Sequence, residues 1–261
     1  MSDLAWKSAI TKVEPNKLVV RGYRLDELIG KVSYAQMVYL LFKGELPSPQ
    51  VGRVIEAILV SSVDHGTTPP SVLSAITVAS TGAPLNAAVA AGILSISKFH
   101  GGAIEDCMHI LQQAKKLMDE KGLNYEQAAA QVINEFREAK KRLSGFGHRI
   151  HNNDPRTKKL FQLAEENGVA GDYVKLALTF VEQLEKITGK HLPLNVDGAI
   201  AALLCELEID PLLANAFFMI ARVPGIVAHV YEEKTRYKPM RKIHPTEVEY
   251  DGPEERDFKQ E

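Results

Sequence analysis

The chain has 261 residues, of which 45% are hydrophobic, and its formal net charge at pH 7 is -2. The apolar fraction is sufficient for a hydrophobic core and excludes a disordered chain, and the near-neutral charge with dispersed Lys and Arg excludes a nucleic-acid-binding surface. Cys107 and Cys205 lie in apolar patterns without CxxC spacing, which predicts buried free thiols and no metal site. With neither a signal peptide nor a run of about 20 apolar residues, we expect a soluble cytoplasmic protein without a membrane partner.

In chain order, the first predicted element is a small β-hairpin over 10–21, where apolar and polar residues alternate. The rest of the chain follows helical spacing. Ser33 and Ser48 are predicted to cap the N-termini of two short helices. A stretch of small residues over 84–97 predicts a central helix that other elements approach closely, and this helix leads to His100.

After a glycine pair at 101–102, amphipathic patterns predict a second layer of helices, and Asn124 with Gln127 predicts a capping box for one of them. A long helical segment starts at Asp210-Pro211. Pro224 should kink this segment because proline removes a backbone donor and crowds the preceding turn. The sequence therefore predicts an all-α protein with one small hairpin.

Three segments place a histidine or a carboxylate beside glycines or a helix start. They contain His100 before Gly101-Gly102, His148 after Gly145-Phe146-Gly147, and Asp197 before Gly198. Glycine permits close approach of backbone and ligand, and two histidines with one acid could carry out proton transfer. Two alternatives remain open: Asp197 as a helix cap, and the segment around His148 as a solvated basic loop.

Further residues could bind an anion. Arg149 and Arg156 offer guanidinium forks for carboxylates, next to the backbone amides of the glycine turn. His65 lies in a polar turn, where a histidine is more often an exposed surface residue. Arg222 and His229 lie about two helical turns apart, so that both can face one cleft. For His229 the alternative is a histidine of the core.

Taken in order, these segments resemble the citrate synthase superfamily over almost the whole chain. The segments are Arg21-Gly22-Tyr23, 39–47 (YLLFKGELP), Asp64-His65-Gly66, His100-Gly101-Gly102-Ala103, 145–149 (GFGHR), Asp154-Pro155-Arg156, 194–197 (LNVD) and 220–229 (IARVPGIVAH). Each segment alone is a weak signal, whereas the whole set in this order is a strong one.

The resemblance implies a two-domain helical fold. A large domain would comprise 1–102 and 211–261, and a small domain over 103–210 would be inserted into it, with the substrates bound in the cleft between the two. It also implies a homodimer or a higher homo-oligomer, in which the partner chain completes the carboxylate pocket with a basic residue. Lys238 stands where the superfamily usually has that arginine, and Arg236 and Arg241 are alternative sources of the charge.

The short chain, the segment from Lys238 to Arg241 and the acidic tail resemble citryl-CoA lyases, a branch of this superfamily. This implies cleavage of (3S)-citryl-CoA to acetyl-CoA and oxaloacetate by retro-aldol chemistry, with coenzyme A as part of the substrate and no separate cofactor or metal. The implied catalytic residues are His100, His148 and Asp197. The implied substrate-binding residues are His65, Arg149, Arg156, Arg222, Lys238 and Arg241, and Gly145, Phe146 and Gly147 would lie along coenzyme A.

Two alternatives to the lyase remain. A citrate or 2-methylcitrate synthase would condense an acyl-CoA with oxaloacetate and would need a water molecule to hydrolyse the thioester. A non-catalytic homologue would bind acyl-CoA without turning it over.

Overall fold

The computed structural model describes residues 6–147 and 154–243 of the chain. Three short strands, β1 (Thr11–Glu14), β2 (Lys17–Val20) and β3 (Tyr23–Arg24), form one antiparallel sheet in the order β1-β2-β3. Asn16 turns the chain between β1 and β2 with φ 60°. The predicted hairpin is therefore confirmed, and β3 extends it by a strand that the sequence pattern did not reveal.

Helices make up most of the rest. They are α1 (Leu25–Leu28), α2 (Tyr34–Lys43), α3 (Pro49–Ser61), α4 (Pro70–Ser80), α5 (Leu85–Leu94), α6 (Ala103–Lys121), α7 (Tyr125–Glu138), α8 (Pro155–Glu166), α9 (Asp172–Thr188), α10 (Val196–Glu206) and α11 (Pro211–Arg236). The predicted caps are confirmed: the side chains of Ser33, Ser48 and Asn124 each accept a hydrogen bond from the first turn of their helix, and Asn124 with Gln127 forms a capping box.

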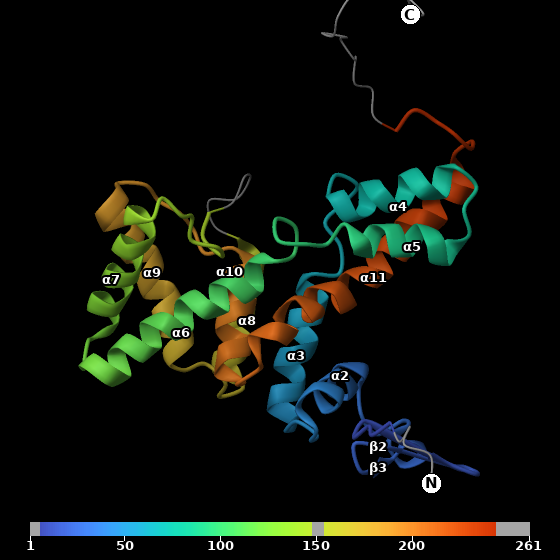
Figure 1. Cartoon of the computed structure of the whole chain (residues 1–261), viewed down its shortest axis with the longest axis horizontal. Coiled ribbons are helices and arrows are strands. Elements are labelled where there is room, and N and C mark those ends of the chain that lie inside the picture. Colours follow the sequence, from blue (N-terminus) through green and yellow to red (C-terminus); the bar gives the residue numbers. More distant parts are fainter. Residues whose placement is uncertain (1–5, 148–153, 244–261) are drawn as a thin grey trace, which may run out of the picture.

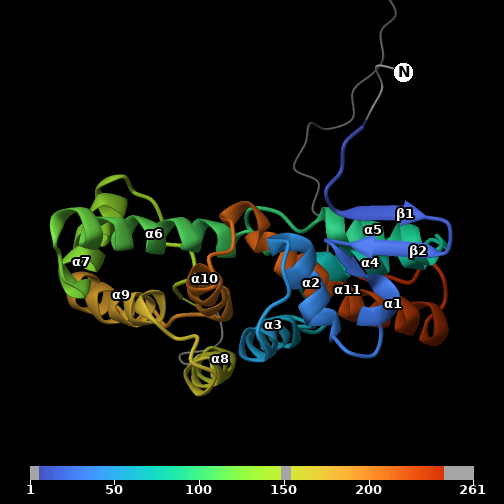
Figure 2. The ribbon, with the colours of Figure 1, turned by 90° about the horizontal axis from the view of Figure 1, so that it is seen from below.

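Figures 1 and 2 both place α6, α7, α9 and α10 at one end of the molecule and the small sheet at the other. The main core forms where α6 packs on α10 and α7 on α9, and it includes the buried free thiols of Cys107 and Cys205. A smaller apolar cluster joins α4, α5 and α11. The predicted boundaries of the small domain fall at the start of α6 and just before α11, and the division into two domains stays a prediction.

Helix α11 links the group of helices around α6 to α3, α4 and α5, because it contacts all four. It runs through Pro224 as one helix of 26 residues, and the kink expected at this proline stays a prediction. In the part of the chain that the structure describes, it is the one helix long and apolar enough to span a membrane, a test that a core helix of a soluble protein also passes.

Candidate active site

Six of the predicted site residues line one pocket of about 590 Å³. They are His65, His100, Gly147, Arg156, Asp197 and Arg222, and they come from six separate segments of the chain. A second cavity of about 660 Å³, near the start of α9 and the end of α10, contains none of the predicted site residues. Within the described ranges, no three His, Cys, Asp or Glu side chains gather as metal ligands.

His100 is held by a tight turn and a buried hydroxyl. Its backbone N–H and C=O both pair with Ser97, at 2.8 and 2.9 Å. Its Nε2 lies 2.8 Å from Oγ of Ser71, a fully buried residue of α4, and its ring meets the edge of Phe218. Burial, and then the nearby charge of Arg222, lower the pKa of His100 below its usual value. The imidazole is therefore neutral at pH 7, so that it can donate a hydrogen bond from one nitrogen and accept at the other.

Asp197 lies in the first turn of α10 but does not cap the helix. That role belongs to Asn195, whose side-chain oxygen accepts a hydrogen bond from the N–H of Gly198 at 3.1 Å. The helix-cap interpretation of Asp197 is therefore wrong, and its carboxyl lines the pocket instead. Burial raises the pKa of Asp197 above its usual value, although the charges of Arg156 and Arg222 oppose the shift. A carboxyl of this kind can hold and release a proton closer to neutral pH.

Arg156 is oriented by its own helix cap. The carboxylate of Asp154, which is 1% exposed, accepts the N–H of Arg156 at 3.0 Å and also binds its guanidinium at 3.0 and 2.8 Å. A guanidinium has five N–H donors, so donors remain for a ligand after this fork is made. Asp154 thus fixes the direction of Arg156 toward the pocket.

Arg222 carries a buried charge that the described residues satisfy only in part. The residue is 3% exposed, its Nε donates to the carbonyl of Ser62 at 2.9 Å, and its guanidinium lies 4.6 Å from the centre of the Phe218 ring. Its Nη1 has no hydrogen-bond partner among the described residues. A buried, unpaired N–H donor is costly, and a carboxylate in the pocket would satisfy it. The pocket is therefore suited to an anionic ligand.

The glycine turn at 145–147 meets the start of α10 very closely. A Cβ on Gly198 would lie 2.5 Å from the carbonyl oxygen of Gly145, which itself accepts the N–H of Asn195 at 3.0 Å. The ring of Phe146 packs 5.5 Å from that of Phe180 in the core. Of the three predicted coenzyme A residues, the structure brings only Gly147 to the pocket.

This close contact makes a testable prediction for stability. Gly198→Ala is expected to lower the free energy of unfolding by about 1–3 kcal/mol, because the added methyl group has rigid backbone on one side. Urea unfolding measures the change. Gly52→Ala is the comparison variant: it lies in a helix, and the three atoms nearest its added Cβ all belong to the side chain of Gln36 and not to backbone. Alanine also favours the helix, so a smaller loss is expected. Equal losses of unfolding free energy in the two variants would contradict the close packing of Gly198 against Gly145.

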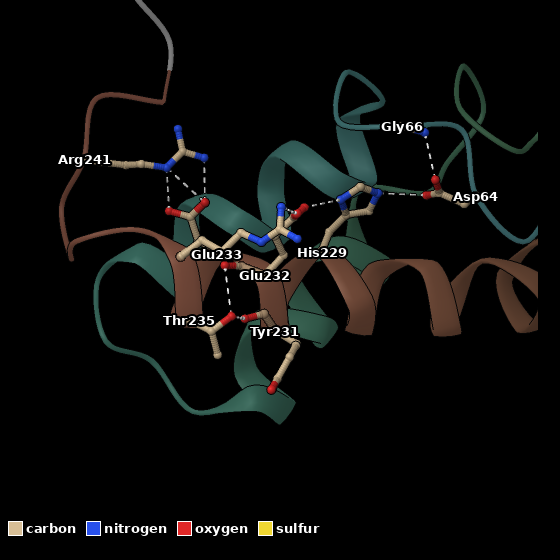
Figure 3. A network of polar contacts seen from close by, with 9 residues as sticks. Asp64, Gly66, His229, Tyr231, Glu232, Glu233, Thr235 and Arg241 are labelled. Carbon is tan, nitrogen blue, oxygen red and sulfur yellow. Dashed lines mark hydrogen bonds and ion pairs between the residues drawn. The ribbon is translucent and has the colours of Figure 1, made fainter.

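Besides Gly145 and Phe146, the predicted site residues Lys238 and Arg241 are not among the residues that line the pocket. His148 and Arg149 lie outside the described residues. Lys238 and Arg241 lie past the end of α11. There Arg241 pairs with buried Glu233 at 2.6 Å (Figure 3). Its guanidinium carbon lies 4.1 Å from the centre of the Tyr237 ring. The backbone N–H of Met240, next to Arg241, donates to the carbonyl of Ser80 at the C-terminal end of α4. The pocket lies at the other end of α4, where Pro70 lines it.

The sequence analysis missed two residues that shape the pocket, Ser71 and Phe218. Ser71 follows two prolines at a helix start, and Phe218 lies one turn before Arg222 on α11. Neither position carries a local signal of function, since a serine near a helix N-terminus and an apolar residue on a helix face both have ordinary structural explanations.

A helical scaffold that presents a neutral imidazole, a desolvated carboxyl and two guanidiniums to one pocket is chemically suited to proton transfer on an anionic ligand. Residues 47–246 match the family model described as citrate synthase, C-terminal domain. The chain therefore belongs to the citrate synthase family, and the resemblance inferred from its motifs is confirmed.

Among solved structures, the citryl-CoA lyase from Hydrogenobacter thermophilus is 43% identical, with a TM-score of 0.87 and 97% of each chain covered. Among curated proteins, ATP-citrate synthase beta chain protein 2 of Arabidopsis thaliana is 28% identical over 90% of this chain. The citrate synthase of Haloferax volcanii is 30% identical over 86% of it. The chain spans 38% and 56% of the lengths of these two relatives.

Proposed function

We propose that this chain is a citryl-CoA lyase, which cleaves (3S)-citryl-CoA into acetyl-CoA and oxaloacetate. The observation that carries the proposal is the buried Arg222, whose Nη1 is left for an anion in the same pocket that holds His100 and Asp197. The 43% identity to a citryl-CoA lyase over 97% of both chains supports the same activity.

In the proposed cleavage, the bond between the acetyl carbon and the carbinol carbon of citryl-CoA breaks. A base, assigned by family resemblance to His148, removes the proton of the tertiary hydroxyl, and the ketone of oxaloacetate forms. The electron pair of the broken bond moves into the thioester, whose oxygen receives a hydrogen bond from neutral His100. Asp197 then donates a proton to the acetyl carbon. Its raised pKa supports this role, because the reaction in this direction needs Asp197 protonated at the start.

The carboxylates of the oxaloacetate half would be held by Arg156, Arg222 and His65, all of which line the pocket. Guanidinium forks bind carboxylates through two parallel hydrogen bonds, which fixes the plane of the ligand as well as its position. Coenzyme A would enter as part of the substrate, so that the proposed chemistry uses no separate cofactor.

We also propose a homodimer. Helix α5 is apolar apart from Asn86, yet Leu85 and Leu94 on it are 49% and 83% exposed, which supports contact with another apolar surface. In such a dimer, Lys238 or Arg241 of one copy could reach the pocket of the other.

A second candidate function is citrate synthesis, which the 30% identity to the citrate synthase of Haloferax volcanii favours. The two activities share the same carbon–carbon bond but differ in the fate of the thioester. A synthase hydrolyses citryl-CoA with an activated water molecule, whereas a lyase excludes that water.

One pair of assays separates these functions. The protein is incubated with (3S)-citryl-CoA and, separately, with acetyl-CoA plus oxaloacetate, while oxaloacetate and free coenzyme A are measured. We expect oxaloacetate from citryl-CoA with little free coenzyme A. Free coenzyme A from the second mixture would indicate a synthase instead. Silence in both mixtures with retained acyl-CoA binding would overturn both assignments in favour of a non-catalytic homologue.

A further inference from the structure

The loop that carries His65 contacts α11 at three positions along that helix, which are Arg222, Gly225 and His229. The Nε of Arg222 donates to the carbonyl of Ser62 at 2.9 Å. Gly225 of α11 lies very close to Val63, the residue after Ser62. A Cβ on Gly225 would be 2.3 Å from the carbonyl oxygen of Val63. His229 then places its Nε2 3.0 Å from Oδ1 of Asp64. These positions lie on one face of α11, so the helix holds the loop over about two turns.

Asp64 transmits this contact to the turn in which His65 lies. Its second carboxylate oxygen accepts the backbone N–H of Gly66 at 3.0 Å, and Gly66 adopts a left-handed φ of 75° (Figure 3). Partial burial would raise the pKa of Asp64, but the hydrogen bonds from Gly66 and His229 outweigh it and lower the pKa. An ionised carboxylate therefore joins α11 to the turn, with His65 between its two anchoring residues.

A second carboxylate lies near the other side of the His229 ring, at a distance too long for a hydrogen bond. The Nδ1 of the ring lies 4.0 Å from Oε2 of Glu232, which in turn pairs with Arg236 at 2.5 Å. The side chain is 15% exposed and is absent from the lining of the pocket that contains His65 and Arg222. His229 thus has the geometry to orient a neighbour and not to contact a bound substrate.

We propose that His229 is a positioning residue for substrate binding, which acts through Asp64 to fix the His65 turn relative to Arg222. This inference rests on the proposed function, in which His65 and Arg222 hold the carboxylates of the oxaloacetate half. The two residues stand on different elements, and the loop from Ser62 to Gly66 links them: one end is bonded to Arg222 itself and the other to His229 through Asp64. When the second bond is lost, the two carboxylate-binding groups lose their fixed separation, and affinity falls.

The test compares His229→Ala with His229→Gln in the full-length protein. In His229→Ala, KM for citryl-CoA is expected to rise about tenfold, the typical worth of a hydrogen bond to a charged group, while kcat changes less than about threefold. The glutamine amide can still donate to Asp64, so His229→Gln should restore a KM near that of the wild type. Asp64→Ala should raise KM by a similar factor, and adding His229→Ala to it should cause little further change.

His191→Ala is the matched control. It removes a histidine whose Nδ1 lies 2.9 Å from a carboxylate oxygen of Glu185, a similar contact that is absent from the pocket lining. This variant should leave KM unchanged. An equal rise of KM in His191→Ala, or a loss of kcat at unchanged KM in His229→Ala, would overturn the inference.

A second readout does not depend on turnover. Hydrogen exchange of the 62–68 segment should be faster in His229→Ala and unchanged in His229→Gln, because the Gly66 amide is protected through Asp64. If the wild-type protein does not cleave citryl-CoA, the proposed function fails, and exchange together with calorimetric binding of oxaloacetate still decides the role of His229. Unchanged exchange and unchanged oxaloacetate affinity in His229→Ala would overturn it.

Discussion

Asp197→Asn is expected to reduce citryl-CoA cleavage about 100- to 10,000-fold, the usual contribution of a positioned acid or base. Asparagine keeps the size and polarity of the side chain, and it leaves the helix cap at Asn195 in place, so the loss should fall on kcat. Steady-state kinetics with citryl-CoA measures the effect. Turnover near that of the wild type would contradict the assignment of Asp197 as the proton donor.

The same substitution should not reduce stability at neutral pH. Because the folded-state pKa of Asp197 is raised, the folded protein favours the protonated carboxyl. The associated stability is complete below the unfolded value of 3.8 and is lost as pH rises through the folded pKa. Asparagine resembles the neutral form, so the variant should melt no lower than the wild type at pH 7, with a smaller difference at pH 4. A clear fall in melting temperature at pH 7 would attribute the lost activity to the fold.

Arg222→Met should raise KM for citryl-CoA about 30- to 4,000-fold, because truncating one partner of a buried charged pair typically costs about 2–5 kcal/mol. The ligand-free variant loses the hydrogen bond to Ser62 and the contact with Phe218, but it also loses a buried charge whose Nη1 lacks a partner among the described residues. Its melting temperature should therefore change less than its KM. Steady-state kinetics measures the change in KM, and the melting temperature of the ligand-free variant measures the change in stability.

Arg222→Lys provides the companion variant. Lysine keeps the positive charge but not the planar fork, so its KM should lie between those of the wild type and Arg222→Met. Oxaloacetate should raise the melting temperature of the wild-type protein and leave that of Arg222→Met nearly unchanged, since a ligand stabilises only a protein that binds it. An unchanged KM in Arg222→Met would contradict the assignment of Arg222 to the substrate carboxylate.

Local signals in the sequence were enough for the fold class and for much of the pocket. The caps at Ser33, Ser48 and Asn124 and the β1–β2 hairpin follow from short-range patterns, because a cap or a turn is built from residues within a few positions of one another. Motif order then placed six residues that line one pocket. The roles of His148 and Arg149, and the division into two domains, stay predictions.

The tertiary structure decided what those residues are able to do. The pKa of Asp197 is raised by burial under groups that are distant in the chain, which no local pattern encodes. Arg222 reaches Ser62 across 160 positions, and His229 reaches Asp64 across 165. Burial, charge and hydrogen-bond partners depend on which helices meet, whereas spacing along the sequence determines only the face of a helix on which a residue lies. The sequence by itself thus determined the helices, the caps and the candidate residues, and the packing of α10 and α11 decided their ionisation and their partners.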